Sequence, residues 1–176
     1  MNIIQRIFED VLVIAPEQKT DCRGSSAVMR MDELSELCGF KTAEQRIYSM
    51  PKAHTFFGIH FQKEPYPQDK LITVIKGAGL DYIIDLREDS PTFAQWRCIG
   101  LSAEKGLAVY IPSGFGHAFL STSDDTIQLF SVNEHFIDGY SRSINCRDGV
   151  IGLDLPDDII ISERDKNAPF LSTDKI

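Results

Sequence analysis

The chain has 176 residues, a formal charge of −8 and a hydrophobic fraction of 43%. This length suits one well-buried core and is too short for two full domains, so residues 1–176 are expected to form a single domain. The composition excludes a largely disordered chain, and the acidic balance argues against non-specific binding to nucleic acid or to an anionic membrane.

The cysteines and the N-terminal segment indicate the compartment. The four cysteines are far apart, with no CxxC pair and no Cys/His cluster at zinc spacing: Cys22, Cys38, Cys98 and Cys146. The opening MNIIQRIFEDVLVIAP has charges among its apolar residues and no small-residue cleavage site, unlike a signal peptide. No apolar run approaches the length of a membrane span. We therefore expect free thiols and a reducing cytoplasm.

Taken in chain order, the first clear element is a helix over Met31–Cys38, with Gly39 placed to end it. From about residue 56 the pattern changes to short strands separated by turn residues. The predicted strands are Phe56–Gln62, Leu71–Lys76, Leu80–Leu86, Trp96–Leu101, Leu107–Ile111, His117–Thr122 and Ile127–Val132. The polar last twenty residues are expected to pack on these strands as a turn or short helix.

Strands at this spacing, with no helices between them, predict an all-β fold rather than an α/β fold. The expected architecture is a jelly-roll β-barrel with minor helices.

Two strands carry the histidines of interest. In Gly58-Ile-His60-Phe-Gln62, strand alternation puts Gly58, His60 and Gln62 on one face. In the second segment a glycine, a strand and a Pro-x-Gly turn precede His117. This spacing resembles the second motif of the cupin superfamily, with Ser121 in place of its terminal asparagine. Together the two histidines predict a shared pocket.

The donor set of this pocket argues against a metal. Metal-binding cupins carry His-x-His and then a glutamate, whereas this chain has His60-x-Gln62. We therefore expect no metal. A buried neutral histidine is suited to proton transfer if a carboxylate orients it. Asp81, Asp85 and Asp165 are all candidates for that carboxylate.

Many short stretches resemble the dTDP-4-dehydrorhamnose 3,5-epimerase family of sugar-nucleotide enzymes, from about Asp21 to Leu171. The matching stretches are Asp21-Cys-Arg23-Gly24, Gly58-Ile-His60-Phe-Gln62, Lys70-Leu, Asp81-Tyr-Ile-Ile-Asp85-Leu-Arg87, Ser90-Pro-Thr-Phe93, Trp96, Leu101-Ser102, Ile111-Pro-Ser-Gly-Phe-Gly-His117-Ala-Phe119, Ile151-Gly-Leu-Asp154-Leu-Pro156 and Ser162-Glu-Arg-Asp165-Lys-Asn-Ala-Pro169.

This resemblance implies a role for each matching residue. His60 falls at the general base, Asp165 at its orienting partner, and Lys70 and His117 near the sugar ketone. Five positions are expected to bind substrate: Arg23, Gln45, Ser49, Gln62 and Arg164. The implied substrate is a 4-keto-6-deoxy sugar linked to a nucleotide, with dTDP as the expected carrier. The resemblance also implies that no metal and no organic cofactor is needed. The implied assembly is a homodimer in which Leu12–Pro16 crosses to the partner.

The chain departs from the family at several positions. Phe130 stands where the family has its tyrosine acid, and a phenylalanine has no proton to donate. Tyr140, Tyr110 or an ordered water are the candidates to replace it. Other departures change the binding site. Ser26 stands in place of an aromatic residue, and four positions lose a charged or polar group: Val28, Ile47, Phe57 and Ser141.

We expect base-catalysed epimerisation at one or two carbons next to the ketone, in a pathway to polysaccharides or glycosides. The departures favour an active relative of changed specificity, which either inverts a single carbon with water as the proton donor or acts on a different sugar nucleotide with a relocated acid. The alternatives are a nucleotide-sugar 3,4-ketoisomerase, a non-catalytic sugar-nucleotide binding module and, more remotely, a metal-dependent cupin oxygenase.

Overall fold

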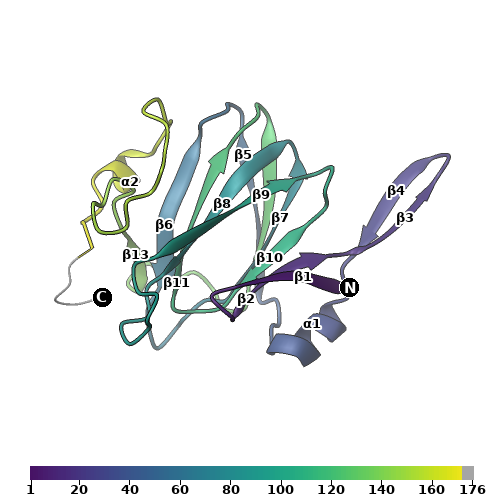
Figure 1. Ribbon diagram of the computed structural model, residues 1–176, viewed down its shortest axis with the longest axis horizontal. Coiled ribbons are helices and arrows are strands. Elements are labelled where there is room, and N and C mark those ends of the chain that lie inside the picture. Colours follow the sequence, from purple (N-terminus) through teal and green to yellow (C-terminus); the bar gives the residue numbers. More distant parts are fainter. Residues whose placement is uncertain (172–176) are drawn as a thin grey trace.

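Two antiparallel sheets face one another in the computed structural model, which describes residues 1–171 (Figure 1). The six-stranded sheet has the order β1-β2-β10-β7-β12-β5, and its strands are β1 (Asn2–Ile7), β2 (Val11–Ala15), β5 (Glu44–Met50), β7 (Lys70–Lys76), β10 (Ala108–Ile111) and β12 (Thr126–Val132). The five-stranded sheet has the order β13-β6-β11-β8-β9, and its strands are β6 (Phe56–Gln62), β8 (Ala78–Asp85), β9 (Trp96–Ser102), β11 (Phe115–Ser121) and β13 (Ser141–Ser143). This is the expected jelly-roll class of fold.

Three apolar clusters hold these layers together. The cluster between the sheets includes Ile72, Ile83 and Phe119, all fully buried. A second cluster lies under helix α1 (Met31–Cys38), where Leu34 packs on the six-stranded sheet. The third joins the five-stranded sheet to the C-terminal segment through residues such as Ile151. The C-terminal segment is thus fixed to the barrel, and it carries helix α2 (Glu163–Lys166).

The structure confirms the helix predicted at Met31–Cys38 and every strand predicted between residues 56 and 132, with small shifts at their ends. Gly39 ends α1 in the left-handed conformation, and its N–H donates to the carbonyl of Ser35. The sequence analysis missed most of the N-terminal strands and β13, because strands such as Asn2–Ile7 mix charged and apolar residues without a regular alternation.

The expectation that Leu12–Pro16 crosses to a partner is wrong. Most of this segment belongs to β2, which pairs with β1 on one edge and with β10 on the other. A different element extends from the barrel: the hairpin of β3 (Glu17–Asp21) and β4 (Gly24–Val28). Figure 1 shows this hairpin at the opposite end of the molecule from α2.

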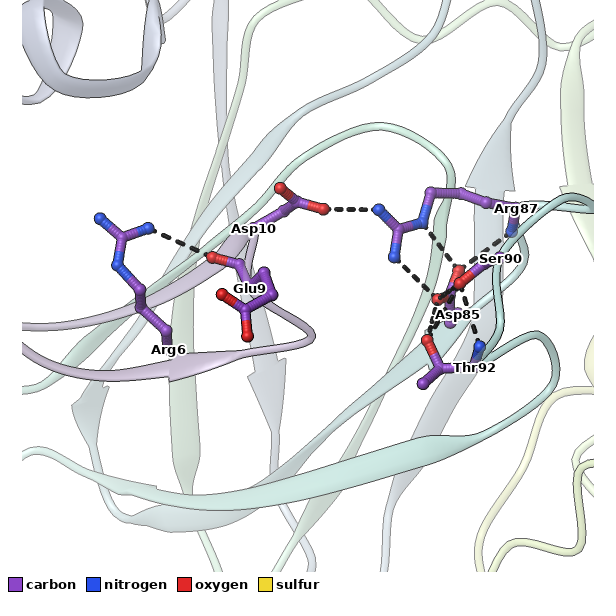
Figure 2. Close-up of polar contacts among 7 residues, drawn as sticks. All are labelled: Arg6, Glu9, Asp10, Asp85, Arg87, Ser90 and Thr92. Carbon is purple, nitrogen blue, oxygen red and sulfur yellow. Dashed lines mark hydrogen bonds and ion pairs between the residues drawn. The ribbon is translucent and has the colours of Figure 1, made fainter.

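A buried carboxylate ties the turn after β8 to the first hairpin (Figure 2). Asp85 accepts hydrogen bonds from the Arg87 guanidinium and from the hydroxyls of Ser90 and Thr92. Arg87 also pairs with Asp10, in the turn between β1 and β2. Burial opposes ionisation of Asp85, but the hydrogen bonds outweigh it and lower its pKa to about 2. Asp85 is therefore occupied structurally and is not the carboxylate that orients a histidine.

Asp85→Asn is expected to lower the free energy of unfolding by about 2 kcal/mol at neutral pH, because Arg87 loses a charged, buried partner. Since the pKa of Asp85 is lowered on folding, its contribution is complete above pH 4 and is lost as the pH falls toward 2. Urea unfolding at pH 7 and pH 3 measures both effects. The matched control is Asp10→Asn, which removes only the exposed partner and is expected to cost a few tenths of a kcal/mol. Equal losses for the two variants would contradict this account.

Candidate active site

A cavity of about 520 Å³ lies between the open ends of the two sheets and is closed on one side by the segment around α2. Its polar lining comes from both sheets and from α2, and its apolar lining is mostly aromatic. The lining residues used below are Arg46, Tyr48, Phe57, His60, Lys70, His117, Gln128, Phe130, Arg164 and Asp165.

The first polar pair joins the five-stranded sheet to α2. His60, on β6, places Nε2 2.7 Å from Oδ1 of Asp165. The Ser162 hydroxyl accepts the backbone N–H of Asp165 and so fixes the start of α2. Burial is the largest single influence on the pKa of Asp165 and would raise it, but the hydrogen bond and charge of His60, together with hydrogen bonds from Ser162 and the backbone of Gly58, outweigh burial and lower the pKa. An ionised carboxylate only accepts, so it selects the Nε2–H tautomer of His60 and leaves Nδ1 free to accept a proton.

The second pair lies deeper. His117 on β11 is the direct register partner of His60, so the two imidazoles belong to adjacent strands. Nε2 of His117 is 2.7 Å from Oδ1 of Asp81, which is fully buried on β8. Burial lowers the pKa of His117, with Asp81 acting in the opposite sense. A neutral His117 has one N–H, and Asp81 accepts it, so this imidazole offers the cavity an acceptor.

A buried lysine faces the same space from the other sheet. Lys70 begins β7, and its Nζ donates to the backbone carbonyl of His60 at 2.7 Å. Burial lowers the pKa of Lys70 to about 7, and the negative charge of Asp81 only partly offsets this. Lys70 therefore changes charge near neutral pH and is the strongest donor next to His60.

The wall beside these groups is aromatic. Phe130, on β12, packs its ring 5.6 Å from the His117 ring and 5.7 Å from the Tyr48 ring, centre to centre. The two tyrosines proposed as replacement acids do not line this cavity. Tyr110 donates to Asp69 on the other side of the six-stranded sheet, and Tyr140 packs against Tyr66.

Three cavity residues were missed by the sequence analysis: Arg46, Tyr48 and Gln128. Two of them alternate with the expected motif residues of β5, so a strand assignment at Glu44–Met50 would have shown that residues 46 and 48 share a face. The third, Gln128, is 2% exposed, and within residues 1–171 its Nε2 has no hydrogen-bond partner.

Of the five predicted substrate-binding residues, one lines the cavity of its own chain and four lie outside it. Arg164 lines the cavity and donates to the Ser141 hydroxyl at 3.2 Å. Gln62 does not reach it, because its amide is bonded to the backbone of Tyr66, His135 and Ile137.

The other three predicted binding residues lie outside the cavity of their own chain. Gln45 and Ser49 point out of the barrel because they alternate with the inward-facing Tyr48, and Gln45 donates to the Ser131 hydroxyl at 3.0 Å. Arg23 lies at the tip of the projecting hairpin, where it pairs with Asp21.

Two features are absent from residues 1–171. They contain no group of three or more His, Cys, Asp or Glu side chains arranged to hold a metal ion. No helix among them has the length and apolar character needed to cross a bilayer.

Comparison with known proteins identifies the chain's relatives. A dTDP-4-dehydrorhamnose 3,5-epimerase from Methanothermobacter thermautotrophicus is 36% identical over 171 residues, covering 94% of this chain and 92% of the relative. A dTDP-4-dehydro-6-deoxyglucose 3-epimerase from Streptomyces bikiniensis is 40% identical over 118 residues; this match covers 66% of the chain and spans only 60% of the relative. The crystal structure of a Bacillus anthracis dTDP-4-dehydrorhamnose 3,5-epimerase with TDP and PPi bound superposes with a TM-score of 0.91, at 32% identity, over 97% of this chain and 99% of that one.

The family model described as dTDP-4-dehydrorhamnose 3,5-epimerase matches residues 5–173, which include every side chain of the cavity. The histidine–carboxylate pairs, the buried lysine and the jelly-roll sheets thus occur within one continuous match, and the chain belongs to the dTDP-4-dehydrorhamnose 3,5-epimerase family.

Proposed function

We propose that this protein is an epimerase that inverts one or two carbons next to the ketone of a dTDP-linked 4-keto-6-deoxy sugar. The observation that carries the proposal is the His60–Asp165 pair, a base with a fixed tautomer at the wall of a cavity of suitable size. The names of its relatives, which include both 3,5- and 3-epimerases, support this substrate class.

The reaction starts with removal of a proton from the carbon next to the ketone. Nδ1 of His60 takes this proton, and Asp165 stabilises the imidazolium that results. The electrons of the broken C–H bond move into the carbonyl and form an enolate. Addition of a proton to the opposite face of that carbon re-forms the ketone with inverted configuration.

Lys70 is the group best placed to stabilise the enolate oxygen. It is buried, it lies beside His60, and an ammonium donor in a site with little water acts strongly on developing charge. His117 can assist in this only when protonated, which its burial opposes. We therefore assign stabilisation of the enolate chiefly to Lys70, and we expect His117 to fix the shape of the cavity wall.

We further propose a homodimer in which Arg23 of each chain serves the cavity of the other. The β3–β4 hairpin lies at the opposite end of the molecule from α2, so Arg23 cannot approach its own cavity as the structure stands (Figure 1). The outer face of the six-stranded sheet exposes Ile47 and Ile75, which a second chain would cover. Within this dimer we keep three further residues as substrate-binding residues: Gln45, Ser49 and Arg164.

Two broader assignments complete the proposal. The four cysteines are free thiols, which suits a cytoplasmic enzyme. An inverted keto-deoxysugar carried on a nucleotide suits later reduction and glycosyl transfer, and we therefore propose a role in polysaccharide or glycoside synthesis.

Incubation with dTDP-4-keto-6-deoxyglucose in deuterated water tests the function. NMR is expected to show deuterium and inversion at C3, or at both C3 and C5. In His60→Asn, which keeps a side chain of similar size, the rate of deuterium exchange is expected to fall by at least about 100-fold. Exchange at C3 with transfer of the carbonyl between carbons would instead indicate a ketoisomerase. Binding of dTDP without exchange at any carbon would contradict catalysis and leave a binding module.

The charge on Lys70 predicts a pH dependence. Because the pKa of Lys70 is lowered to about 7, kcat/KM is expected to fall by about tenfold per pH unit above that value, as the ammonium that stabilises the enolate is lost. Lys70→Arg keeps a positive charge at all these pH values and is expected to remove the fall, at a lower overall rate. A wild-type profile that stays flat from pH 7 to pH 9 would rule out this role.

Mixing two inactive variants tests the shared site. In a heterodimer of Arg23→Ala and His60→Asn chains, one cavity combines an intact His60 with an intact partner Arg23. Random subunit exchange is therefore expected to restore about a quarter of wild-type activity, since half of the dimers carry one intact site of two. The control mixture is the double variant Arg23→Ala/His60→Asn with His60→Asn, which is expected to regain none. Activity that does not exceed the sum of the separate variants would contradict the crossed arrangement.

A further inference from the structure

Inversion needs a proton from the face of the sugar opposite His60, and Phe130 has none to give. Among the described residues that line the cavity, Tyr48 is the only phenol. It belongs to β5 of the six-stranded sheet, whereas His60 belongs to β6 of the five-stranded sheet. A sugar ring in the cavity would therefore have the base and this hydroxyl on opposite walls.

The Tyr48 ring is held in place by two phenylalanines. Its centre is 5.7 Å from that of Phe130, with the rings at 80°, and 5.3 Å from that of Phe57. Both phenylalanines stand at positions where the family carries a polar group, a tyrosine and an arginine. The phenol lies on the strand next to Phe130, and both residues line the wall of the same cavity.

Gln128 gives independent evidence of a ligand beside Tyr48. These two residues are direct partners in the register of β5 and β12. Gln128 is 2% exposed and lines the cavity, and its Nε2 has no hydrogen-bond partner within residues 1–171. An unpaired buried donor costs free energy, which a polar atom of a bound molecule would recover. A sugar oxygen next to Gln128 would bring the ring to Tyr48.

Arg46 supplies a positive charge at the same place. It lies two residues before Tyr48 on the same face of β5 and is held by an ion pair with Glu44. The pKa of Arg46 is raised, first by its hydrogen bond to Glu44 and to a smaller extent by the Tyr48 hydroxyl. Arg46 and Tyr48 both line the cavity from the same strand. A cation beside the hydroxyl stabilises the phenolate that remains after proton donation.

We propose that Tyr48 is the proton donor of the second half of the reaction, an inference that rests on the proposed function. The Tyr48 hydroxyl gives its proton to the enolate carbon on the face opposite His60. The enolate electrons form the new C–H bond as the ketone re-forms, and the phenolate then takes a proton from solvent. The proton on His60 also returns to solvent, so no other reactant is needed.

Tyr48→Phe tests this directly, because it removes one oxygen and keeps the ring contacts. In deuterated water, exchange at C3 is expected to continue within a few-fold of wild type, since His60 can return a deuteron to its own face. Formation of the inverted sugar is expected to fall by about 100-fold or more. Tyr140→Phe is the matched control, since it removes a phenol near the site but outside the cavity, and it is expected to leave both rates unchanged.

Restoring a hydroxyl on the neighbouring ring adds a second test. Tyr48→Phe/Phe130→Tyr is expected to recover part of the inversion rate lost in the single variant. Inversion at the wild-type rate in Tyr48→Phe would overturn the assignment, and so would an equal loss of exchange and inversion in a variant whose thermal unfolding is normal. Failure of the wild type to exchange would instead overturn the proposed function, and this inference with it.

Discussion

The hydrogen bond between His60 and Asp165 is the interaction on which the site depends. It joins residues 105 positions apart in the chain, one on a barrel strand and one on a short C-terminal helix. The apolar cluster under the C-terminal segment and the Ser162 cap of α2 both serve to bring the carboxylate to the imidazole. Without that packing, His60 would be a partly exposed imidazole with no fixed tautomer.

Much of the fold was predictable because it follows from local patterns. The helix at Met31–Cys38 has an apolar face and a glycine at its end, and the strands from residue 56 onward alternate between clear turn signals. The N-terminal strands were not predictable in this way, because strands such as β1 lack a regular alternation and β2 takes its place in the sheet through long-range pairing with β10. The prediction that Leu12–Pro16 crosses to a partner was wrong because the local sequence does not show that both edges of β2 pair with strands of the same chain.

The site was only partly predictable. Residue type and family resemblance located His60, Lys70, His117 and Asp165, and the cavity brings all four together. Which carboxylate meets which imidazole depends on three-dimensional packing: Asp165 meets His60, Asp81 meets His117, and Asp85 binds Arg87. The strand at Glu44–Met50 was not predicted, so its alternation was not applied, and Tyr48 went unnoticed while its outward-facing neighbours Gln45 and Ser49 were named.

The projecting hairpin has a consequence for how the protein responds to dilution. A two-stranded ribbon that leaves its own barrel is marginally stable alone, and its residues are almost all exposed. If a second chain provides the surface on which this ribbon rests, then association, ribbon order and the position of Arg23 are linked by mass action. Apparent substrate affinity would then weaken as the enzyme is diluted below its dimer dissociation constant, although no residue of the catalytic pair has moved.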